Sequence, residues 1–317
     1  MTASTAPDPS HGSDTAVEFS ASADSVPCVL SFNANDPSGA GGVASDALVI
    51  SSIGAHALPV LTGIYLRDTR DVHGHVALDD ATVSEQATLV AEDAPIQAIK
   101  VGFLGSPEAV ATAAAFAADY PTVPLVAYLP DLSWWSESEI DDYLDAFREL
   151  LLPQTAVLVG NNTTLRHWLL PESATNRHAR AVDLARAASE LGVSYLLVTG
   201  IAQPGDQLRN VLATPQAELY SQSFERIDAG FSGAGDILSA ALAALIATGA
   251  ELAEATAQAL QYLDQALDHG FRPGMGRAVA DRLFWAAEPD ADEGEGADDA
   301  EPADSLDFPH PSNETKH

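Results

Sequence analysis

Short apolar segments recur along the chain and alternate with longer segments in which the apolar positions have helical spacing. Segments rich in Val, Leu, Ile or Tyr lie at 27–32, 57–62, 96–101, 123–128, 155–160 and 194–199. Such short, continuous apolar segments are typical of strands that are buried on both faces of a sheet. Between them, helices are predicted over 43–53, 107–119, 138–151 and 178–191. This alternation predicts an α/β protein with a doubly wound, mainly parallel sheet sandwiched by helices.

The order of the elements changes after residue 200. Two strand-like segments near 208–213 and 217–227 precede two long helical patterns, about 236–248 and 251–268. The first of these helices is apolar on nearly every side, which predicts that it is buried in the core or at a subunit contact. The segment 62–80 is polar and rich in turn-forming residues, and we expect it to form a small lid or an edge feature of the sheet.

Charge and composition separate a folded middle from two acidic ends. The 317 residues include 46 acidic and 14 basic ones, and the net charge is −32. Residues 1–26 and 288–317 have no apolar periodicity and cannot bury enough apolar surface to offset the entropy of ordering. Both ends are therefore predicted to be disordered, and the segment 27–287 is predicted to be one globular domain.

The composition also excludes several classes of protein. The single cysteine, Cys28, rules out an intramolecular disulfide framework and a Cys-based zinc site. No apolar run is long enough to cross a bilayer, and no basic segment followed by an apolar one precedes the first predicted strand. A net charge of −32 repels phosphate backbones, which argues against nucleic acid as a partner. We therefore expect a cytoplasmic protein that acts on a small molecule and not on a membrane.

Two glycine clusters are the strongest candidates for a functional site. The first, Asn35-Asp36-Pro37-Ser38-Gly39-Ala40-Gly41-Gly42, lies between a predicted strand and a predicted helix. A glycine-rich turn in this place lets a ligand approach the backbone and the helix N-terminus, although glycine is also the usual residue of any tight turn. The turn has neither the Gly-Lys-Ser of a Walker A loop nor the G-x-G-x-x-G pattern, so by itself it does not define a ligand.

The second cluster, Gly233-Ala234-Gly235-Asp236, begins the most apolar helix of the chain. Small residues in this place expose backbone N–H groups with the positive end of the helix dipole behind them, which suits an anion. Two roles are open for Asp236: a helix cap, or a general base that accepts a proton from a substrate hydroxyl. Because a base beside an anion hole is the combination that phosphoryl transfer to an alcohol requires, the spacing favours catalysis.

Taken together, these motifs resemble the ribokinase-like superfamily, and within it the hydroxymethylpyrimidine/phosphomethylpyrimidine kinases of thiamine biosynthesis. The resemblance covers roughly 28–286 and includes five blocks in order. They are Asp36–Gly42 with Asp46, Ala98–Ser106, Val159–Thr164, Leu197–Ile201, and Gly274-Met275-Gly276 as the G-x-G that the family has before its last helix. The resemblance implies a ribokinase-like kinase domain over 27–287. It also implies transfer of the γ-phosphate of ATP, with Mg²⁺, to hydroxymethylpyrimidine or its monophosphate.

The same resemblance assigns roles to individual residues. Asp236 falls on the catalytic position, and Gly233, Ala234 and Gly235 fall on the anion hole. The substrate-binding residues are expected to be Ala34, Gly41, Asp46, Arg67 and Phe103. The nucleotide-binding residues are expected to be Asn161, Thr199 and Gly200. Lys100 is expected to pair with a carboxylate or to contact a phosphate, no metal ligand is assigned, and a homodimer is expected because the family often forms dimers.

The sequence departs from the family at several positions. The pyrimidine kinases usually have a cysteine where this chain has Asp236, and a carboxylate is more fully ionised than a thiol at pH 7. The family's pyrimidine-binding glutamine is replaced by Arg67, which cannot accept a hydrogen bond. The acid of the family's Asn-x-x-Glu pair is replaced by Thr164, and the D-P-V segment reads Tyr128-Leu129-Pro130.

Three functions therefore remain open. The first is a pyrimidine kinase with an altered pocket. The second is a ribokinase-like kinase for another small alcohol, such as a pyridoxal-like ring or an anionic substrate drawn to Arg67. The third is a diverged, non-catalytic binder of nucleotide or pyrimidine. The complete Gly-Ala-Gly-Asp sequence favours the two kinases, because a binder does not need a base in that position.

The acidic surface predicts that stability depends on salt. Acids outnumber bases within 27–287 as well, and Lys100 and Lys316 are the only lysines of the chain. Such a composition fits either an ordinary solvated surface or halophilic adaptation, in which screening offsets the repulsion between carboxylates. We favour the second hypothesis and expect the midpoint of unfolding to rise as KCl is increased from low to molar concentration. A midpoint that does not change with salt would contradict it.

Overall fold

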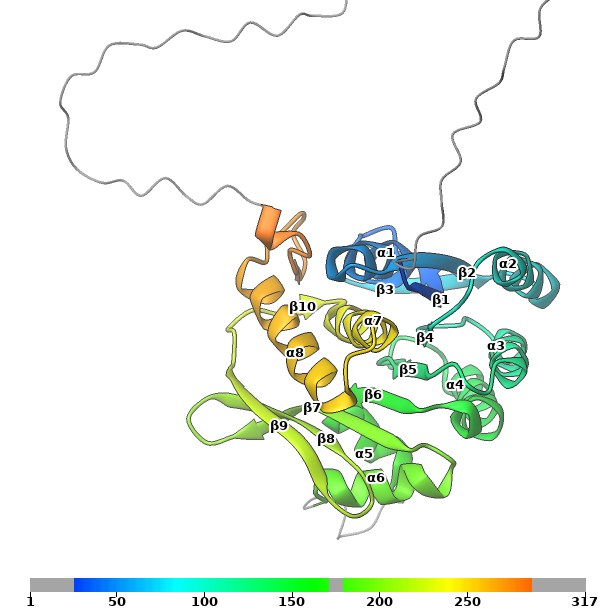
Figure 1. Ribbon diagram of the computed structural model, residues 1–317. Coiled ribbons are helices and arrows are strands. Elements are labelled where there is room, and N and C mark those ends of the chain that lie inside the picture. The colour runs from blue at the N-terminus through cyan, green and yellow to red at the C-terminus, as the bar shows by residue number, and fades with distance from the viewer. Residues whose placement is uncertain (1–25, 171–178, 287–317) are drawn as a thin grey trace, which may run out of the picture. The chain divides into compact units, whose positions relative to one another are not determined.

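The computed structural model describes residues 26–170 and 179–286 (Figure 1). The chain divides into two units, Met1–Phe284 and Trp285–His317, and only Trp285 and Ala286 of the second are described. The fold given below is that of the first unit. The predicted disorder of 1–26 and 288–317 lies outside the described residues, apart from Val26.

A nine-stranded sheet forms the centre of the described part, in the order β3-β2-β1-β4-β5-β6-β7-β8-β9. Its strands are β1 (Cys28–Asn35), β2 (His56–Arg67), β3 (Val72–Ala77), β4 (Ala98–Val101), β5 (Leu125–Leu129), β6 (Val157–Asn161), β7 (Tyr195–Gln203), β8 (Gln207–Ala213) and β9 (Glu218–Glu225). The six central strands, β2, β1, β4, β5, β6 and β7, are parallel. At one edge β3 pairs antiparallel with β2, and at the other β8 pairs antiparallel with β7 and β9 with β8. The prediction of a doubly wound, mainly parallel sheet is confirmed.

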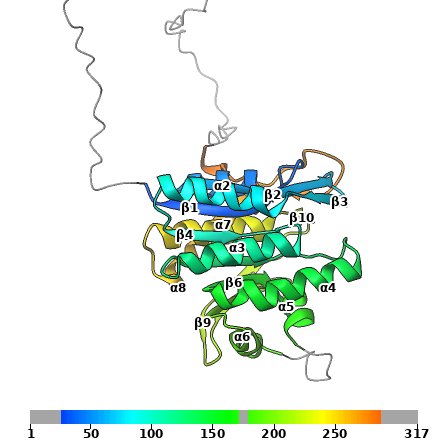
Figure 2. The same ribbon diagram turned by 90° about the vertical axis from the view of Figure 1, so that its right-hand side faces the viewer.

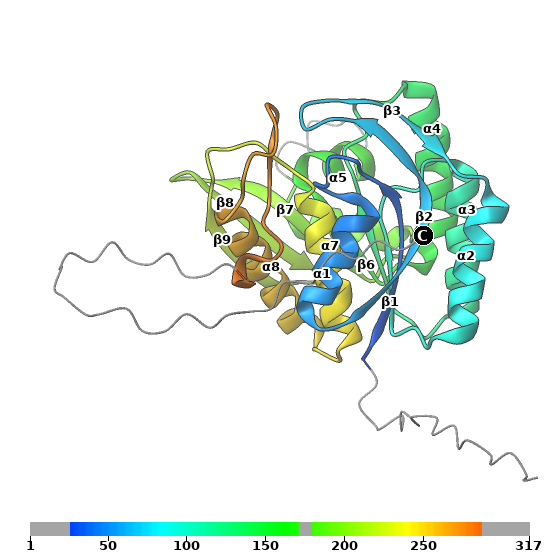
Figure 3. The same ribbon diagram turned by 90° about the horizontal axis from the view of Figure 1, so that it is seen from above.

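Helices cover both faces of this sheet (Figures 1 and 3). One face carries α1 (Gly42–Ile53), α7 (Ala234–Ala247) and α8 (Leu252–Asp268). The other carries α2 (Asp80–Asp93), α3 (Pro107–Asp119), α4 (Glu137–Ala146), α5 (Asn162–Leu169) and α6 (Ala181–Glu190). The apolar helix α7 is buried from Ile237 to Leu245 and lies in the core. Among the described residues, no helix is both long and apolar enough to span a membrane.

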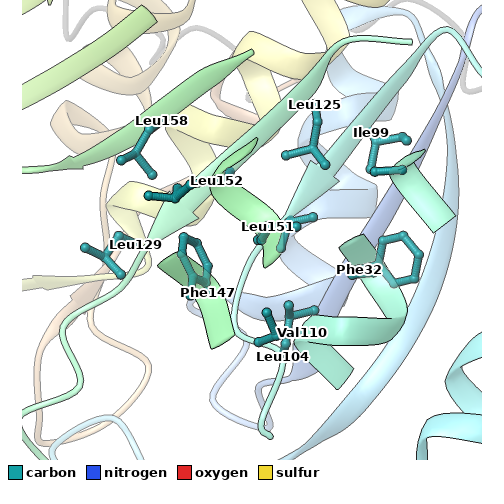
Figure 4. Close-up of a cluster of buried hydrophobic side chains, with 14 of the residues drawn as sticks. Phe32, Ile99, Leu104, Val110, Leu125, Leu129, Phe147, Leu151, Leu152 and Leu158 are labelled. Carbon is teal, nitrogen blue, oxygen red and sulfur yellow. The ribbon is translucent and has the colours of Figure 1, made fainter. Parts of the chain in front are cut away.

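On the face of the sheet that carries α2 to α6, the core contains residues from strands, helices and irregular turns. After α4 the chain continues as a π-helical turn, η1 (Phe147–Leu151), and a 3₁₀ turn, η2 (Leu152–Gln154). Phe147, Leu151 and Leu152 of these turns belong to the same buried cluster as Phe32 and Leu125 of the strands (Figure 4). Figure 2 looks onto this side, where α3 packs between α2 and α4. These contacts bury the strands on this face of the sheet.

The predicted elements agree with the observed ones at most positions. Helix α3 begins at Pro107 as predicted, since Ser106 Oγ accepts a hydrogen bond from the N–H of Ala109 at 3.1 Å and so caps the helix. The polar segment 62–80 includes the β2–β3 hairpin, which confirms an edge feature of the sheet. The pattern does not predict α2 or α5, because few of their residues are buried and the helical spacing is therefore weak.

The closing G-x-G block is in a different place from the one expected. Gly274-Met275-Gly276 follows α8, and the only helical element after it within the described residues is the 3₁₀ turn η4 (Phe284–Ala286). The block lies in a loop that returns from α8 to a small parallel pair of strands, β10 (Phe231–Ser232) and β11 (Ala278–Val279). The loop is thereby brought close to the start of α7, which follows β10 directly.

Candidate active site

The N-terminus of α7 lies at the carboxyl ends of the parallel strands. Open α/β sheets bind their ligands at this end of the strands. Strand β1 ends at Asn35 and leads into the glycine-rich loop 36–42. Helix α7 approaches this loop closely because Gly233, its N-cap residue, has a left-handed φ of 83°. A side chain on Gly233 would overlap the carbonyl oxygen of Ala40. The glycine is therefore needed for this approach.

A buried ammonium group joins two carboxylates at this junction. Lys100 Nζ on β4 lies 2.8 Å from Asp46 Oδ2 on α1 and 2.8 Å from Asp236 Oδ1 on α7. The side chains of Lys100 and Asp46 are fully buried, whereas 16% of the Asp236 side chain is exposed. Charges removed from water in this way are tolerated only when they are paired and hydrogen-bonded.

Neutral donors complete the cluster. Asn33 Nδ2 donates to both carboxylates, at 3.0 Å to Asp46 Oδ2 and at 2.9 Å to Asp236 Oδ1. Ser31 Oγ donates to Asp46 Oδ2 at 2.7 Å, and the N–H of Gly42 donates to Asp236 Oδ2 at 3.2 Å. The carboxylate of Asp236 is thus held by β1, β4 and the start of α1. The N-cap residue of α7 is Gly233, and the Asp236 carboxylate is bonded to Asn33, Gly42 and Lys100 of other elements, so the structure does not support a helix-cap role for Asp236.

The cluster shifts the pKa values of the two carboxylates in opposite directions. Burial raises the pKa of Asp46 above its ordinary value, although Lys100 opposes this shift. Burial acts in the same direction on Asp236, but the Lys100 ammonium and the hydrogen bonds from Lys100, Gly42 and Asn33 outweigh it and lower the pKa of Asp236. Burial alone would lower the pKa of Lys100, but the two carboxylates raise it. At neutral pH Asp236 is therefore ionised and Lys100 is protonated.

A cavity of about 1330 Å³ lies over the Asp236 carboxylate. Eight of the predicted site residues line it: Gly41, Arg67, Asn161, Thr199, Gly233, Ala234, Gly235 and Asp236. The structure thus brings together residues predicted for the acceptor, the anion hole and the nucleotide. A side chain on Gly41 would lie 2.6 Å from Asp236 Oδ2, so the bare glycine leaves this oxygen accessible. The first N–H groups of α7 have no acceptors within the helix and are available to a ligand.

Four predicted residues are absent from the lining of this cavity. Ala34 and Asp46 are fully buried, Phe103 is 2% exposed, and the N–H of Gly200 donates to Asn210 Oδ1 at 3.0 Å. Asp46 binds Lys100, so its place is behind Asp236. Phe103 stacks on a residue that does line the cavity, Tyr65, with ring centroids 5.0 Å apart. Direct contact of these four residues with a ligand therefore stays a prediction.

Arg67 stands in the cavity wall between the two glycine clusters. Its Nη1 lies 3.3 Å from Asp36 Oδ2, and its Nη2 donates to Ser232 Oγ at 3.3 Å. Asp36 Oδ2 also accepts a hydrogen bond from the N–H of Gly41 at 3.1 Å. The guanidinium is thus fixed beside the start of α7, where it offers donors and no acceptor to a ligand.

The opposite side of the cavity contains both charged side chains, such as Asp131 and Glu137, and the uncharged Asn161 and Thr199. Asn161 caps α5, since its Oδ1 accepts from the N–H of Thr163 at 2.9 Å, and Thr199 Oγ1 donates to the carbonyl of Gly160 at 3.3 Å. The ring of Tyr128 packs against Gly235. Burial raises the pKa of Tyr128 well above its usual range, so its hydroxyl is neutral. Within the described part of the chain, no group of three or more His, Cys, Asp or Glu residues could hold a metal ion.

Some residues of the site are not predicted by the sequence. Ser31 and Asn33 lie in an apolar strand and have no motif of their own. The sequence feature that could have indicated them is the alternation of Ser31 and Asn33 with the apolar Leu30 and Phe32. This alternation places the two polar side chains on one face of β1. For Lys100, the expected alternatives were a carboxylate or a phosphate, and the structure shows contacts with two carboxylates.

Solved structures of small-molecule kinases share this fold. The pyridoxal kinase of Bacillus subtilis, in complex with ADP, has a TM-score of 0.72 and 21% sequence identity, and the match covers 82% of this chain and 99% of that one. The phosphomethylpyrimidine kinase of Clostridium difficile has a TM-score of 0.60 and 20% identity, with 74% and 98% covered. At these identities the likeness shows the fold alone. The fold is that of the ribokinase-like kinases.

The sequence itself identifies the family. The pattern of the phosphomethylpyrimidine kinase family matches residues 36–281. The hydroxymethylpyrimidine/phosphomethylpyrimidine kinase of Streptomyces coelicolor is 29% identical over 268 residues, which cover 82% of this chain and 95% of the relative. The chain therefore belongs to the phosphomethylpyrimidine kinase family and is a phosphotransferase, as the resemblance of its motifs predicted.

Replacement of Lys100 tests the charge cluster. Lys100→Met leaves two buried carboxylates facing each other, so the free energy of unfolding at neutral pH should fall by about 3–5 kcal/mol. The wild-type contribution of Lys100, whose folded pKa is raised, is complete below its unfolded pKa of 10.5 and is lost as the pH rises through the folded pKa. The contribution of Asp236, whose folded pKa is lowered, is present above the ordinary value of 3.8 and is lost in acid.

The difference in stability between wild type and Lys100→Met should therefore be largest near neutral pH and should shrink toward both extremes. Urea unfolding of both proteins across the pH range, at fixed high salt, measures it. A second variant, Lys100→Met with Asp46→Asn, removes one of the opposed carboxylates and should recover part of the loss. A difference that does not vary with pH would contradict the account.

Proposed function

We propose that this protein transfers the γ-phosphoryl group of ATP to hydroxymethylpyrimidine, or to its monophosphate, in thiamine biosynthesis. Asp236 is the general base of this proposal. One observation carries it: an ionised carboxylate, held by Lys100 and Asn33, lines the cavity at the N-terminus of α7. Membership of the phosphomethylpyrimidine kinase family and the relative from Streptomyces coelicolor support the choice of acceptor.

The two oxygens of Asp236 have different tasks in the proposed reaction. Oδ1 accepts hydrogen bonds from Lys100 and Asn33, which fix the orientation of the carboxylate. Oδ2 accepts from Gly42 and lies beside the bare Gly41, so it can also receive the proton of the acceptor hydroxyl. With hydroxymethylpyrimidine as the acceptor, the proton passes from its hydroxyl to Asp236 as the hydroxyl oxygen attacks the γ-phosphorus, and the bond from this phosphorus to the β,γ-bridging oxygen breaks and releases ADP. With the monophosphate, an ionised phosphate oxygen attacks and no proton has to be removed.

The start of α7 supplies the complementary positive potential. Gly233, Ala234 and Gly235 line the cavity, and the N–H groups of a first helical turn are free to bind the oxygens of the phosphoryl group in transfer. The helix dipole adds to this attraction. The neutral hydroxyl of Tyr128, whose ring packs on Gly235, is a further donor beside the same turn.

Mg²⁺ belongs to this proposal as part of the Mg·ATP substrate. Proteins commonly hold Mg²⁺ through one or two carboxylates together with substrate phosphates and water. The described residues fit that role, because Asp131, Asn161 and Thr164 line the same cavity with oxygen atoms. Asp131 is the only carboxylate of the three, so most of the ligands of the ion would come from the nucleotide and water. When bound, the ion would offset the charge of the phosphates.

Arg67 favours a second candidate for the acceptor. Where the family has an amide, this residue offers only donors, and its guanidinium is fixed by Asp36 and Ser232. A ring that is recognised by a paired donor and acceptor loses part of its binding energy at such a position. Another small alcohol, pyridoxal-like or anionic, is therefore the alternative to hydroxymethylpyrimidine.

Release of ADP from Mg·ATP distinguishes the acceptors. Hydroxymethylpyrimidine, its monophosphate and pyridoxal are offered separately, at about 0.1 M and at molar KCl, which span the range of charge screening. We expect turnover with at least one of the two pyrimidines. Turnover with pyridoxal alone would support the second candidate instead. No turnover with any of the three at either salt concentration would contradict both kinase assignments and leave a non-catalytic binder.

The role of Asp236 is tested by Asp236→Asn, which keeps the shape of the side chain and removes the base. Turnover should fall on the order of 10²-fold or more. Folding and ATP binding should be nearly unchanged, because Lys100 keeps Asp46 as its partner. Asp80→Asn makes the same change in the first turn of α2, where the side chain is exposed, and should retain full turnover. Undiminished turnover of Asp236→Asn would show that this carboxylate is not the base.

A further inference from the structure

Tyr65 forms part of the wall of the cavity on the β2 side of the site. It alternates along β2 with the exposed Ile64 and Leu66, so its ring lies on the inner face of the strand. Arg67 is the next residue on this inner face, and both side chains line the cavity. Tyr65 and Arg67 are therefore neighbours in the part of the site that faces the proposed acceptor.

The hydroxyl of Tyr65 is accessible and has no partner among the residues that the structure describes. No hydrogen bond or ion pair of this side chain is present within 26–170 and 179–286. The oxygen is also not one of the buried polar atoms that the core leaves without a partner. Because the residue lines the cavity, this hydroxyl is free to bind a ligand there.

Two aromatic contacts fix the orientation of the Tyr65 ring. The ring stacks on Phe103, with centroids 5.0 Å apart and an angle of 21° between the planes. Trp134, which also lines the cavity, contacts the same ring edge-on, with centroids 5.8 Å apart. Packing of this kind favours one orientation of an aromatic ring. The hydroxyl is thus held in place before a ligand binds.

The hydroxyl is neutral and lies within the electrostatic reach of the base. Burial is the largest cause that raises the pKa of Tyr65 well above its ordinary value of 10.0, and the negative charge of Asp236 is the next. A neutral hydroxyl donates one hydrogen bond and can also accept. Tyr65 therefore offers a hydrogen-bond acceptor to a ligand that is bound beside Asp236.

The two carboxylates that act on Tyr65, those of Asp36 and Asp236, have other partners. Asp36 Oδ1 accepts two hydrogen bonds from Ser38, and Asp36 Oδ2 lies 3.3 Å from Arg67 Nη1. Asp236 is the proposed base and is paired with the buried ammonium group. Arg67 itself has donors and no acceptor. The tyrosine hydroxyl is thus an acceptor without another partner beside a group that only donates.

The spacing of Tyr65 and Arg67 suits one substituted ring. Residues two apart on a strand lie about 7 Å from each other along the backbone, so the ends of two long side chains can reach neighbouring atoms of a single ring. In hydroxymethylpyrimidine, the amino group is a hydrogen-bond donor and the ring nitrogen beside it is an acceptor. These two groups complement the hydroxyl of Tyr65 and the guanidinium of Arg67.

We propose that Tyr65 is a specificity-determining residue of the acceptor site, where its hydroxyl accepts a hydrogen bond from the amino group of the pyrimidine. Arg67 donates to the adjacent ring nitrogen, so the two side chains together provide the acceptor and the donor that this edge of the ring requires. The inference rests on the proposed function. It favours hydroxymethylpyrimidine over the pyridoxal-like alternative, which has no amino group to donate.

Titration calorimetry of the full-length protein with two ligands tests the role of the hydroxyl. The ligands are hydroxymethylpyrimidine and its analogue without the amino group. Tyr65→Phe keeps the ring and its contacts with Phe103 and Trp134. In this variant the dissociation constant for hydroxymethylpyrimidine should rise about tenfold, because one hydrogen bond is lost. The constant for the analogue should change less than about twofold, since the analogue does not make this bond.

Tyr120→Phe is the matched control, because Tyr120 follows α3, stacks on Phe116 and does not line the cavity. It should change neither constant by more than about twofold. A second variant, Tyr65→Phe/Arg67→Gln, places an amide with both a donor and an acceptor beside the ring. It should recover part of the affinity for hydroxymethylpyrimidine that Tyr65→Phe loses.

The outcomes separate this inference from the proposed function. An unchanged constant for hydroxymethylpyrimidine in Tyr65→Phe, or an equal rise for both ligands, would overturn the inference, and turnover of the wild type with hydroxymethylpyrimidine would still support the kinase. Selective weakening in Tyr65→Phe without release of ADP from the wild type would support the inference while the kinase function fails. A wild type that binds neither ligand would overturn both.

Discussion

The site depends on the ammonium group of Lys100, which is buried with two carboxylates. A buried charge requires partners, and Lys100 on β4 finds them in Asp46 of α1 and Asp236 of α7. Asn33 bridges the same two carboxylates from β1. Four elements, of which only β1 and α1 are consecutive in the sequence, are thereby joined at one point. Burial raises the pKa of Asp236, but the Lys100 ammonium and the hydrogen bonds from Lys100, Gly42 and Asn33 outweigh it, so this carboxylate is held ionised at the edge of the cavity.

The residues of the candidate site come from different strands and follow one another in the order of the strands across the sheet. The β2–β3 edge supplies Arg67 and Arg70, the centre supplies the base and the start of α7, and β6 and β7 supply Asn161 and Thr199. This order fits the proposed reaction, in which the acceptor, the transferred phosphoryl group and the nucleotide lie side by side.

Local signals predict most of the fold but only part of the site. Helix α3 is predicted to its first residue because Ser106 and Pro107 form a complete start signal, and Asp236 stands out because small residues precede it. The partners of Lys100 cannot be predicted in this way, since they depend on how β1 and β4 pair and on how α7 packs beneath them. The same limit applies to Asp46, because its burial against Lys100 follows from the packing of α1 and not from its neighbours in the sequence.

The central claim, that Lys100 keeps Asp236 ionised, is tested most directly by titration of the carboxylate itself. Carboxyl ¹³C NMR of protein labelled at the aspartate side chains, with the signal assigned by its loss in Asp236→Asn, gives the pKa of this group. The account predicts a value below the ordinary 3.8 in the wild type and a higher value in Lys100→Met. A wild-type pKa at or above the ordinary value would contradict the account, because burial and not Lys100 would then control the carboxylate.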